Sequence, residues 1–167
     1  PQTTATAPAR DHENEDGEQA EHYANYRKLY ERKFKGMDLP ERLETAAKAH
    51  GNELAAICLD PNPQMITRAI ENGASDIMCA RIVASHATAS LSLLALGKKP
   101  TFLFDPGVRR NLLRNPITPP YLRRRILEMM DMQTLYTVRS GSDVNEHSKM
   151  EAVEVMRQKF RSASGAD

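Results

Sequence analysis

Six arginines within one stretch of 17 residues are the side chains best suited to bind a partner. They are Arg109, Arg110, Arg114, Arg123, Arg124 and Arg125. A guanidinium group keeps its charge and carries a planar fork of donors that matches carboxylates and phosphates in pairs of hydrogen bonds. The pattern therefore predicts a basic ridge that binds an acidic protein segment, a nucleic acid or another anion. The alternative is a solvated face that binds nothing.

The distribution of charge favours a protein partner over a nucleic acid. The net charge is only +1, with 23 basic and 22 acidic side chains. Acids are in excess over residues 1–60, and bases are in excess over residues 97–140. A dedicated nucleic-acid binder usually carries a larger basic excess. We therefore predict an acidic protein partner for the arginines and keep nucleic acid as the alternative.

The sequence predicts neither catalysis nor a cofactor. The chain has no glycine-rich phosphate loop, no Gly-x-Ser-x-Gly elbow and no His-Glu-x-x-His pattern. None of the five histidines stands at metal-ligand spacing from another, and His86 is expected at the surface of a turn. We predict that the chain is not an enzyme and that it has no catalytic residues, metal, cofactor or small-molecule substrate.

The cysteines and the apolar runs bear on the compartment. Cys58 and Cys79 lie in apolar runs and are expected to be buried thiols in a reducing environment. No apolar run is long enough to span a bilayer, and the first residues lack a signal-peptide pattern. We therefore predict a cytoplasmic protein without a membrane partner. Only 5% of the residues are aromatic, which favours an all-α core of aliphatic side chains and methionine.

Two short helices are expected to carry the arginines. Asp105-Pro106 and Thr118-Pro119 each place a capping side chain directly before a proline. An N-cap oxygen accepts from the free N–H groups of the first turn, and a proline at the first helical position loses no hydrogen bond. The apolar residues of both helices are expected to face a core, so most of the arginines are expected to point outward.

Similar start signals recur through the middle of the chain, at Asn62, Ser75, Thr88, Asp105 and Thr118. They delimit helices of about three turns, which are too short to be stable alone in water. A shift of 43 residues aligns Pro63 with Pro106. The same shift aligns Asn72 with Asn115. Regular stacking of such helices predicts a short α-solenoid.

The stretch DPGVRRNLLRNPITPPYLRRRIL, residues 105–127, resembles a unit of the bacterial leucine-rich-repeat-variant and HEAT-like helical repeats. In those repeats an Asp-Pro start, an apolar helix, an Asn-Pro-x-Thr-Pro turn and a second helix recur. The resemblance is looser over residues 60–96. It implies stacked helical hairpins that act as a binding surface, and it assigns no activity. An iron–sulfur centre is not implied, because only Cys58 and Cys79 are present.

The N-terminal part is expected to contain a tail and an amphipathic helix. Residues 1–17 are small, polar and acidic, and they predict a disordered tail. From Glu18 onward, apolar and aromatic residues recur at spacings of three and four, which predicts a helix docked on the core. These residues are Ala20, Tyr23, Tyr26, Tyr30 and Phe34.

The C-terminal part is expected to contain a loop and a closing helix. Residues 133–142 break the helical pattern and predict a loop. Ser142 is the expected N-cap of a last helix over residues 143–162, which caps the stack. The predicted apolar face of this helix consists of His147, Met150, Val153, Met156 and Phe160. The helical-repeat domain is therefore expected to span residues 18–132, and its predicted role is that of a protein-binding adaptor or scaffold.

Overall fold

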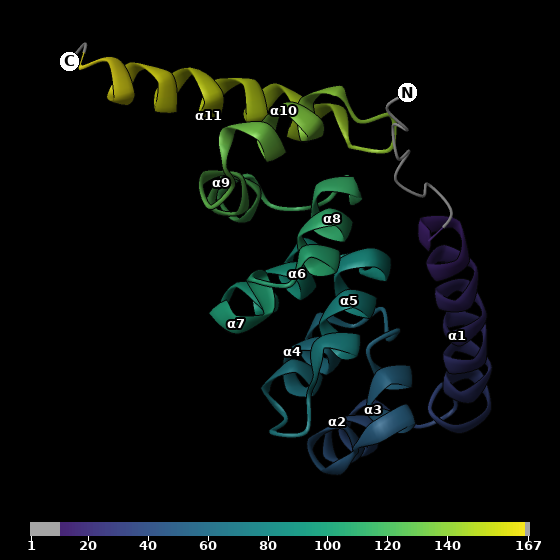
Figure 1. The fold of residues 1–167 in the computed structure, drawn as a ribbon. Coiled ribbons are helices and arrows are strands. Elements are labelled where there is room, and N and C mark those ends of the chain that lie inside the picture. The colour runs from purple at the N-terminus through teal and green to yellow at the C-terminus, as the bar shows by residue number, and fades with distance from the viewer. Residues whose placement is uncertain (1–10, 166–167) are drawn as a thin grey trace, which may run out of the picture.

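The computed structural model describes residues 11–165, and every regular element in this range is a helix (Figure 1). The all-α prediction is confirmed. The elements are α1 (Asp11–Lys33), α2 (Leu39–Lys48), α3 (Gly51–Ile57), α4 (Pro63–Glu71), α5 (Ile77–His86), α6 (Ser90–Gly97), α7 (Pro100–Leu103), α8 (Pro106–Arg114), α9 (Pro120–Glu128), α10 (Met132–Ser140) and α11 (Glu146–Ser164).

Alternate helices of the chain pack on one another and form two rows. Helix α3 packs on α1 and α5, and α8 packs on α5, so these four helices share one row. Helix α4 packs on α2 and α6 in the other row, and α9 packs on α11. Figure 1 shows the succession rising from α2 and α3 at the base to α10 and α11 at the top. The single turn α7 is inserted between α6 and α8.

Short polar side chains define the starts of most helices. Asp105 Oδ1 accepts from Val108 N at 2.9 Å, and Asn62 Oδ1 accepts from Gln64 N at 2.8 Å, as predicted. Asp131 Oδ1 caps α10 in the same way, through Thr134 N at 2.7 Å. The common device is an Asp or Asn in extended backbone just before the first turn.

Four predicted N-caps are wrong, although the helices they announce exist. Asp76 caps α5 instead of Ser75, and Asn145 caps α11 instead of Ser142. In both cases the side-chain oxygen of an Asp or Asn further along the chain accepts from the first turn instead of the serine hydroxyl. Helix α6 begins after Ala89, one residue beyond Thr88, without a side-chain cap. Thr118 does not cap α9, because its hydroxyl donates to Leu112 O at 2.6 Å and Pro119 takes the N-cap position.

Two asparagines 43 residues apart make the same set of hydrogen bonds. Asn72, after α4, donates from Nδ2 to two carbonyl groups at the end of α2, at 2.8 and 2.9 Å. Asn115, after α8, donates from Nδ2 to two carbonyl groups at the end of α5, both at 3.1 Å. Each Oδ1 also accepts from the backbone N–H two residues further on. The predicted 43-residue correspondence therefore holds in the hydrogen bonds as well as in the sequence.

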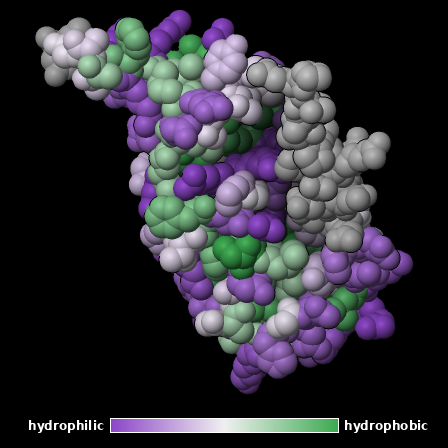
Figure 2. All heavy atoms as spheres, in the orientation of Figure 1, coloured by the Kyte–Doolittle hydropathy of each residue, from purple (hydrophilic) through white to green (hydrophobic). Residues whose placement is uncertain are grey.

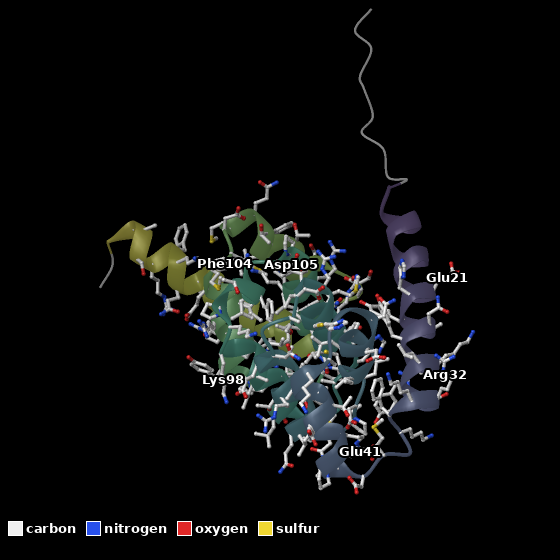
Figure 3. All side chains as sticks on the ribbon, turned by 90° about the horizontal axis from the view of Figure 1, so that it is seen from below. Glu21, Arg32, Glu41, Lys98, Phe104 and Asp105 are labelled. Atoms are coloured by element: carbon white, nitrogen blue, oxygen red, sulfur yellow. The ribbon has the colours of Figure 1, made fainter. Side chains whose placement is uncertain are left out.

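Helix α1 lies along one side of the stack and docks through its C-terminal half. Phe34 is fully buried, Tyr30 is nearly so, and Tyr23 and Tyr26 pack on the core from its edge. Tyr30 donates to the buried Asp60 at 2.7 Å, and burial together with this bond raises the pKa of Tyr30 to about 12. Seen from below, Glu21 and Arg32 point away from the stack (Figure 3). The amphipathic helix is thus confirmed, except that Ala20 is exposed.

The start of α1 departs from the predicted tail. Residues 11–17 belong to the helix, which begins at Asp11 rather than at Glu18. Once a helix is anchored by packing, each further residue adds one hydrogen bond for the two dihedral angles it fixes, so the helix can extend past the packed part. The predicted disorder of residues 1–10 lies outside the described residues.

The predicted loop over residues 133–142 is wrong, because Met132–Ser140 form α10. Thr134, Thr137 and Val138 have low intrinsic helix propensity, which hides the helix in the sequence. Packing overrides this preference, since Leu135 and Val138 are buried one turn apart where α10 packs on α11. The chain therefore ends in a helical hairpin and not in an isolated helix.

The buried face of α11 also differs from the prediction. Ser148, Ala152 and Val155 face inward, whereas Met150 and Phe160 are each 70% exposed. Small side chains allow α11 to approach α9 and α10 closely, and the larger ones remain on the outer face. His147 is exposed as well. The predicted apolar face of α11 is therefore wrong for His147, Met150 and Phe160, whereas Met156 packs partly buried against the core.

Candidate partner-binding groove

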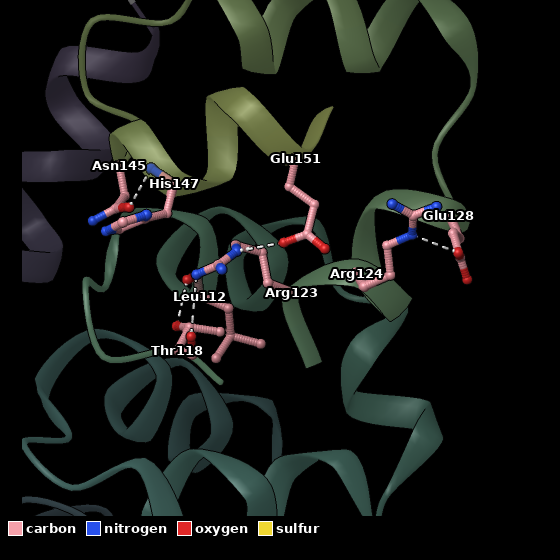
Figure 4. A network of polar contacts seen from close by, with 8 residues as sticks. All are labelled: Leu112, Thr118, Arg123, Arg124, Glu128, Asn145, His147 and Glu151. Carbon is pink, nitrogen blue, oxygen red and sulfur yellow. Dashed lines mark hydrogen bonds and ion pairs between the residues drawn. The ribbon is translucent and has the colours of Figure 1, made fainter. Parts of the chain in front are cut away.

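The three arginines of α9 connect this helix to other parts of the chain. Arg123 Nε donates to Glu151 Oε2 of α11 at 2.7 Å (Figure 4). Arg124 Nε donates to Glu128 at 2.7 Å, and its Nη2 donates to Gln158 of α11. Arg125 Nη1 donates to the carbonyl group of Gly97, at the end of α6, at 2.9 Å. These guanidinium groups join α9 to α6 and α11.

The three arginines of α8 face a different part of the molecule. Arg109 donates from Nε to the carbonyl group of Leu103, and its guanidinium carbon lies 6.0 Å from the ring centroid of Phe104. Arg114 pairs with Asp143, in the connection between α10 and α11. Arg110 is exposed. The prediction of one outward ridge is therefore wrong, because α8 and α9 direct their arginines toward different neighbours.

A groove of about 610 Å³ between α8 and α10 collects the arginines of α8. Its apolar lining consists of Leu113, Met130, Val138 and Val144. The hydroxyl groups of Thr134 and Thr137 line the α10 side. Arg109, Arg110 and Arg114 line the α8 side, together with Asp143 and Pro106. The groove thus combines an apolar lining with a charged rim.

The rim of this groove carries a positive charge, which a carboxylate of the groove itself partly neutralises. Three guanidinium groups stand against the single carboxylate of Asp143. The hydrogen bond from Arg114, supported by the charge of Arg110, holds the pKa of Asp143 below its ordinary value. Asp143 is therefore ionised at neutral pH and balances one of the three positive charges. The sequence analysis did not single out Asp143, which was expected to be the first residue of the last helix, over residues 143–162.

The start of α8, which carries these arginines, is held on α5 by an ion pair. Arg81 donates from Nε and Nη2 to the two carboxylate oxygens of Asp105, at 2.9 and 2.8 Å. This bond lowers the pKa of Asp105. Gly107 leaves room for the pair, because a Cβ atom there would come within 2.8 Å of Arg81 Nε. This contact adds to the apolar packing of α8 on α5 and helps to fix the start of the helix that lines the groove.

A second groove of about 550 Å³ is lined by α4 and α6, in the other row of helices. Leu43, Leu91 and Leu94 form much of its apolar lining, and Leu91 is 65% exposed. Its charged residues are of both signs: Arg68, Lys98 and Glu71. This groove is more apolar and less basic than the one between α8 and α10.

His86 and the two cysteines serve packing. His86 ends α5, half-buried, with its ring edge-to-face against Tyr23 at 4.7 Å, and burial lowers its pKa. The surface turn predicted for His86 is therefore wrong. Cys58 and Cys79 are buried as predicted, and a hydrogen bond between their thiols raises the pKa of Cys58. Among residues 11–165, no three metal-ligating side chains gather into a cluster.

Comparisons with protein-family models, curated proteins and solved structures found no match for this chain. Within the described range, none of the helices is both long and apolar enough to cross a membrane.

Proposed function

We infer that the chain is a non-enzymatic, protein-binding α-solenoid of the kind that the leucine-rich-repeat-variant and HEAT-like resemblance implies. Two observations support this architecture: alternate helices pack in two rows, and Asn72 and Asn115 repeat one hydrogen-bonding pattern at a 43-residue interval. Helical solenoids offer long grooves between neighbouring helices, and such grooves commonly bind peptides.

The binding site of this adaptor is the groove between α8 and α10, and its partner is an acidic amphipathic helix. The observation that carries this proposal is the meeting of an apolar lining with Arg109, Arg110 and Arg114 in one groove. An amphipathic helix places its apolar side chains on the lining, while carboxylates beside that face reach the guanidinium groups. The same three arginines were among the six predicted to bind a partner.

Nucleic acid is less well supported as the ligand of these arginines. All three arginines of α9, and two of the three on α8, already donate to groups of the chain itself. A phosphate backbone is bound by a continuous run of available cations, each of which releases counterions. The arginines of this chain are instead divided between the groove and the contacts of α9.

A peptide-display selection tests the proposal without assuming a partner. We expect an unbiased library, panned on the intact protein, to yield peptides with an apolar helical face flanked by Asp and Glu. Arg110→Glu should weaken their binding at least tenfold in fluorescence anisotropy, because it places a like charge against the carboxylates. Arg139→Glu is the matched control, since this exposed arginine of α10 does not line the groove and should leave affinity within twofold.

This groove would be excluded as the site if the recovered peptides lack acidic residues, or if Arg110→Glu leaves their affinity unchanged. A labelled single-stranded RNA and a labelled DNA duplex serve as nucleic-acid probes over a salt series. Binding that falls steeply with salt, with no peptide recovered, would favour nucleic acid instead.

A further inference from the structure

The two grooves occupy corresponding positions of the 43-residue repeat. On the first helix of each, three lining positions match when the chain is shifted by 43 residues: Pro63 with Pro106, Thr67 with Arg110, and Glu71 with Arg114. The first pair is identical, and the other two exchange a neutral or acidic side chain for arginine. The first helix of each groove therefore lines it with the same backbone positions, which carry different side chains in the two grooves.

The second helix of each groove shows the same correspondence. Helix α6 is the second helix after α4 in the chain, as α10 is the second after α8, and their lining positions again match at 43 residues. The pairs are Leu91 with Thr134, Leu94 with Thr137, Ala95 with Val138, and Lys98 with Gly141. Seven lining positions thus recur at one spacing across two separate helix pairs, which no single-helix periodicity explains.

The corresponding grooves lie on different rows of the molecule. Helix α4 packs on α2 and α6, whereas α8 packs on α5 in the row of α1 and α3. The reason lies in the number of helices between the two copies. Successive helices alternate between the rows, and α8 is the third helix after α4 when the single turn α7 is not counted. An odd number of steps moves the second copy of the unit to the other row. Ligands in the two grooves therefore do not compete for space.

We propose that the groove between α4 and α6 is a second peptide-binding site, which takes a leucine-rich helical segment carrying a carboxylate. This proposal rests on the proposed function of the α8–α10 groove. Leu91 is 65% exposed, and with Leu94 it replaces the two threonines of the other groove, so the occupant needs a larger apolar face. Arg68 and Lys98 outnumber Glu71 by one charge, so the complementary segment has one carboxylate in excess.

The chain is therefore bivalent, with one row selecting an acidic amphipathic helix and the other an apolar one. Specificity follows from the residues exchanged at matching positions. Arg110 and Arg114 favour several carboxylates, whereas Thr67 and Glu71 do not. Leu91 and Leu94 favour leucine-type side chains, whereas Thr134 and Thr137 present hydroxyl groups. Figure 2 shows apolar and hydrophilic side chains interleaved over one face of the molecule.

Panning the display library on the Arg110→Glu variant tests this second site separately, because that variant disables the α8–α10 groove. We expect leucine-rich peptides that bind the wild type and the Arg110→Glu variant within twofold of each other. Leu91→Glu should weaken them at least tenfold, while leaving the acidic peptides of the first groove within twofold. Leu91 is exposed, so the substitution should leave the far-ultraviolet circular dichroism unchanged.

Simultaneous binding provides the second readout. An acidic and a leucine-rich peptide with donor and acceptor dyes should show energy transfer only when both bind one protein molecule. If panning on Arg110→Glu returns no peptide, while the wild type returns acidic ones, the second site is rejected and the proposed function stands. If the leucine-rich peptides compete with the acidic ones, the bivalent arrangement is also rejected. If neither protein returns peptides, both proposals fail together.

Discussion

At the scale of single residues, Asp143 decides how much positive charge the α8–α10 groove offers. It pairs with Arg114 from the connection between α10 and α11, and it is ionised at neutral pH because this bond lowers its pKa. In the proposed complex, a ligand carboxylate competes with Asp143 for the same guanidinium group. On this proposal, a residue of the chain itself limits the affinity of the groove for acidic helices.

Asp143→Asn should therefore strengthen the binding of acidic peptides. Both partners of the ion pair are more than a third exposed, so its loss should cost less than about 1 kcal/mol of stability. The gain in affinity should be of the same order, about two- to fivefold, measured by fluorescence anisotropy. Glu154→Gln, an exposed change on α11, is the control for net charge. An unchanged or weaker affinity in Asp143→Asn would show that Arg114 does not contact the peptide.

Asp105 links acid sensitivity to the placement of α8. The bond from Arg81 lowers its pKa in the folded state, so its stabilising contribution is complete above the ordinary carboxyl value of 3.8. This contribution disappears as the pH falls through the lowered pKa. Asp105→Asn keeps a capping oxygen but removes the ion pair. Urea unfolding should show the variant less stable at about pH 7, with the difference shrinking below about pH 4. A difference independent of pH would contradict the role of the ion pair.

At the scale of helices, the asparagines after α4 and α8 connect one row member to the next. Asn115 is 8% exposed, so the two carbonyl groups it reaches have little access to water. Leaving buried acceptors without a donor costs more than an ordinary hydrogen bond contributes. Asn72 therefore stabilises the end of α2, and Asn115 stabilises the end of α5. Each asparagine also stabilises the turn in which it lies.

Asn72→Ala and Asn115→Ala should each lower the free energy of unfolding, by roughly 1–3 kcal/mol. The two losses should be similar, because the two residues make the same hydrogen bonds. Asn25→Ala, at an exposed position of α1, is the matched control and should be close to neutral. Chemical denaturation monitored by circular dichroism measures all three. A loss of stability at only one of the two sites would show that the two asparagines do not contribute equally to the free energy of unfolding.

The sequence predicted helices where caps and apolar spacing agree, and it failed where packing decides. Asn62 and Asp105 were recognisable because each stands before a proline. Helix α10 was missed, because its β-branched residues oppose a helix and its stability comes from contact with α11. The groove could not be predicted in full, since Asp143 and Val138 join Arg114 only through the tertiary arrangement.

At the scale of the whole molecule, each helix depends mainly on its neighbours in the stack. The contacts of α9 with α11 include the ion pair between Arg123 and Glu151, whose side chains are 11% and 20% exposed. In the proposed solenoid, contacts between distant parts are few, so a local defect should remain local.

Arg123→Gln should therefore loosen one end of the molecule selectively. The loss of a well-shielded charged hydrogen bond should cost about 2 kcal/mol. Hydrogen exchange followed by mass spectrometry should show faster exchange in α10 and α11, with α2–α5 unchanged. Arg157→Gln is the control, since its contact with Glu154 is long, 3.6 Å, and exposed. A uniform increase across all helices would show that the chain unfolds as one cooperative unit.

The asparagine contacts carry a consequence for how such a chain can change in length. Each asparagine donates to main-chain carbonyl oxygens, so the contact does not require particular side chains on the helix that it reaches. A segment that brings its own asparagine can be copied, removed or transplanted onto any helix that ends in the same way. Evolution can thus lengthen or shorten the molecule one segment at a time. Adding a segment with an odd number of helices places the groove of the added segment on the other row.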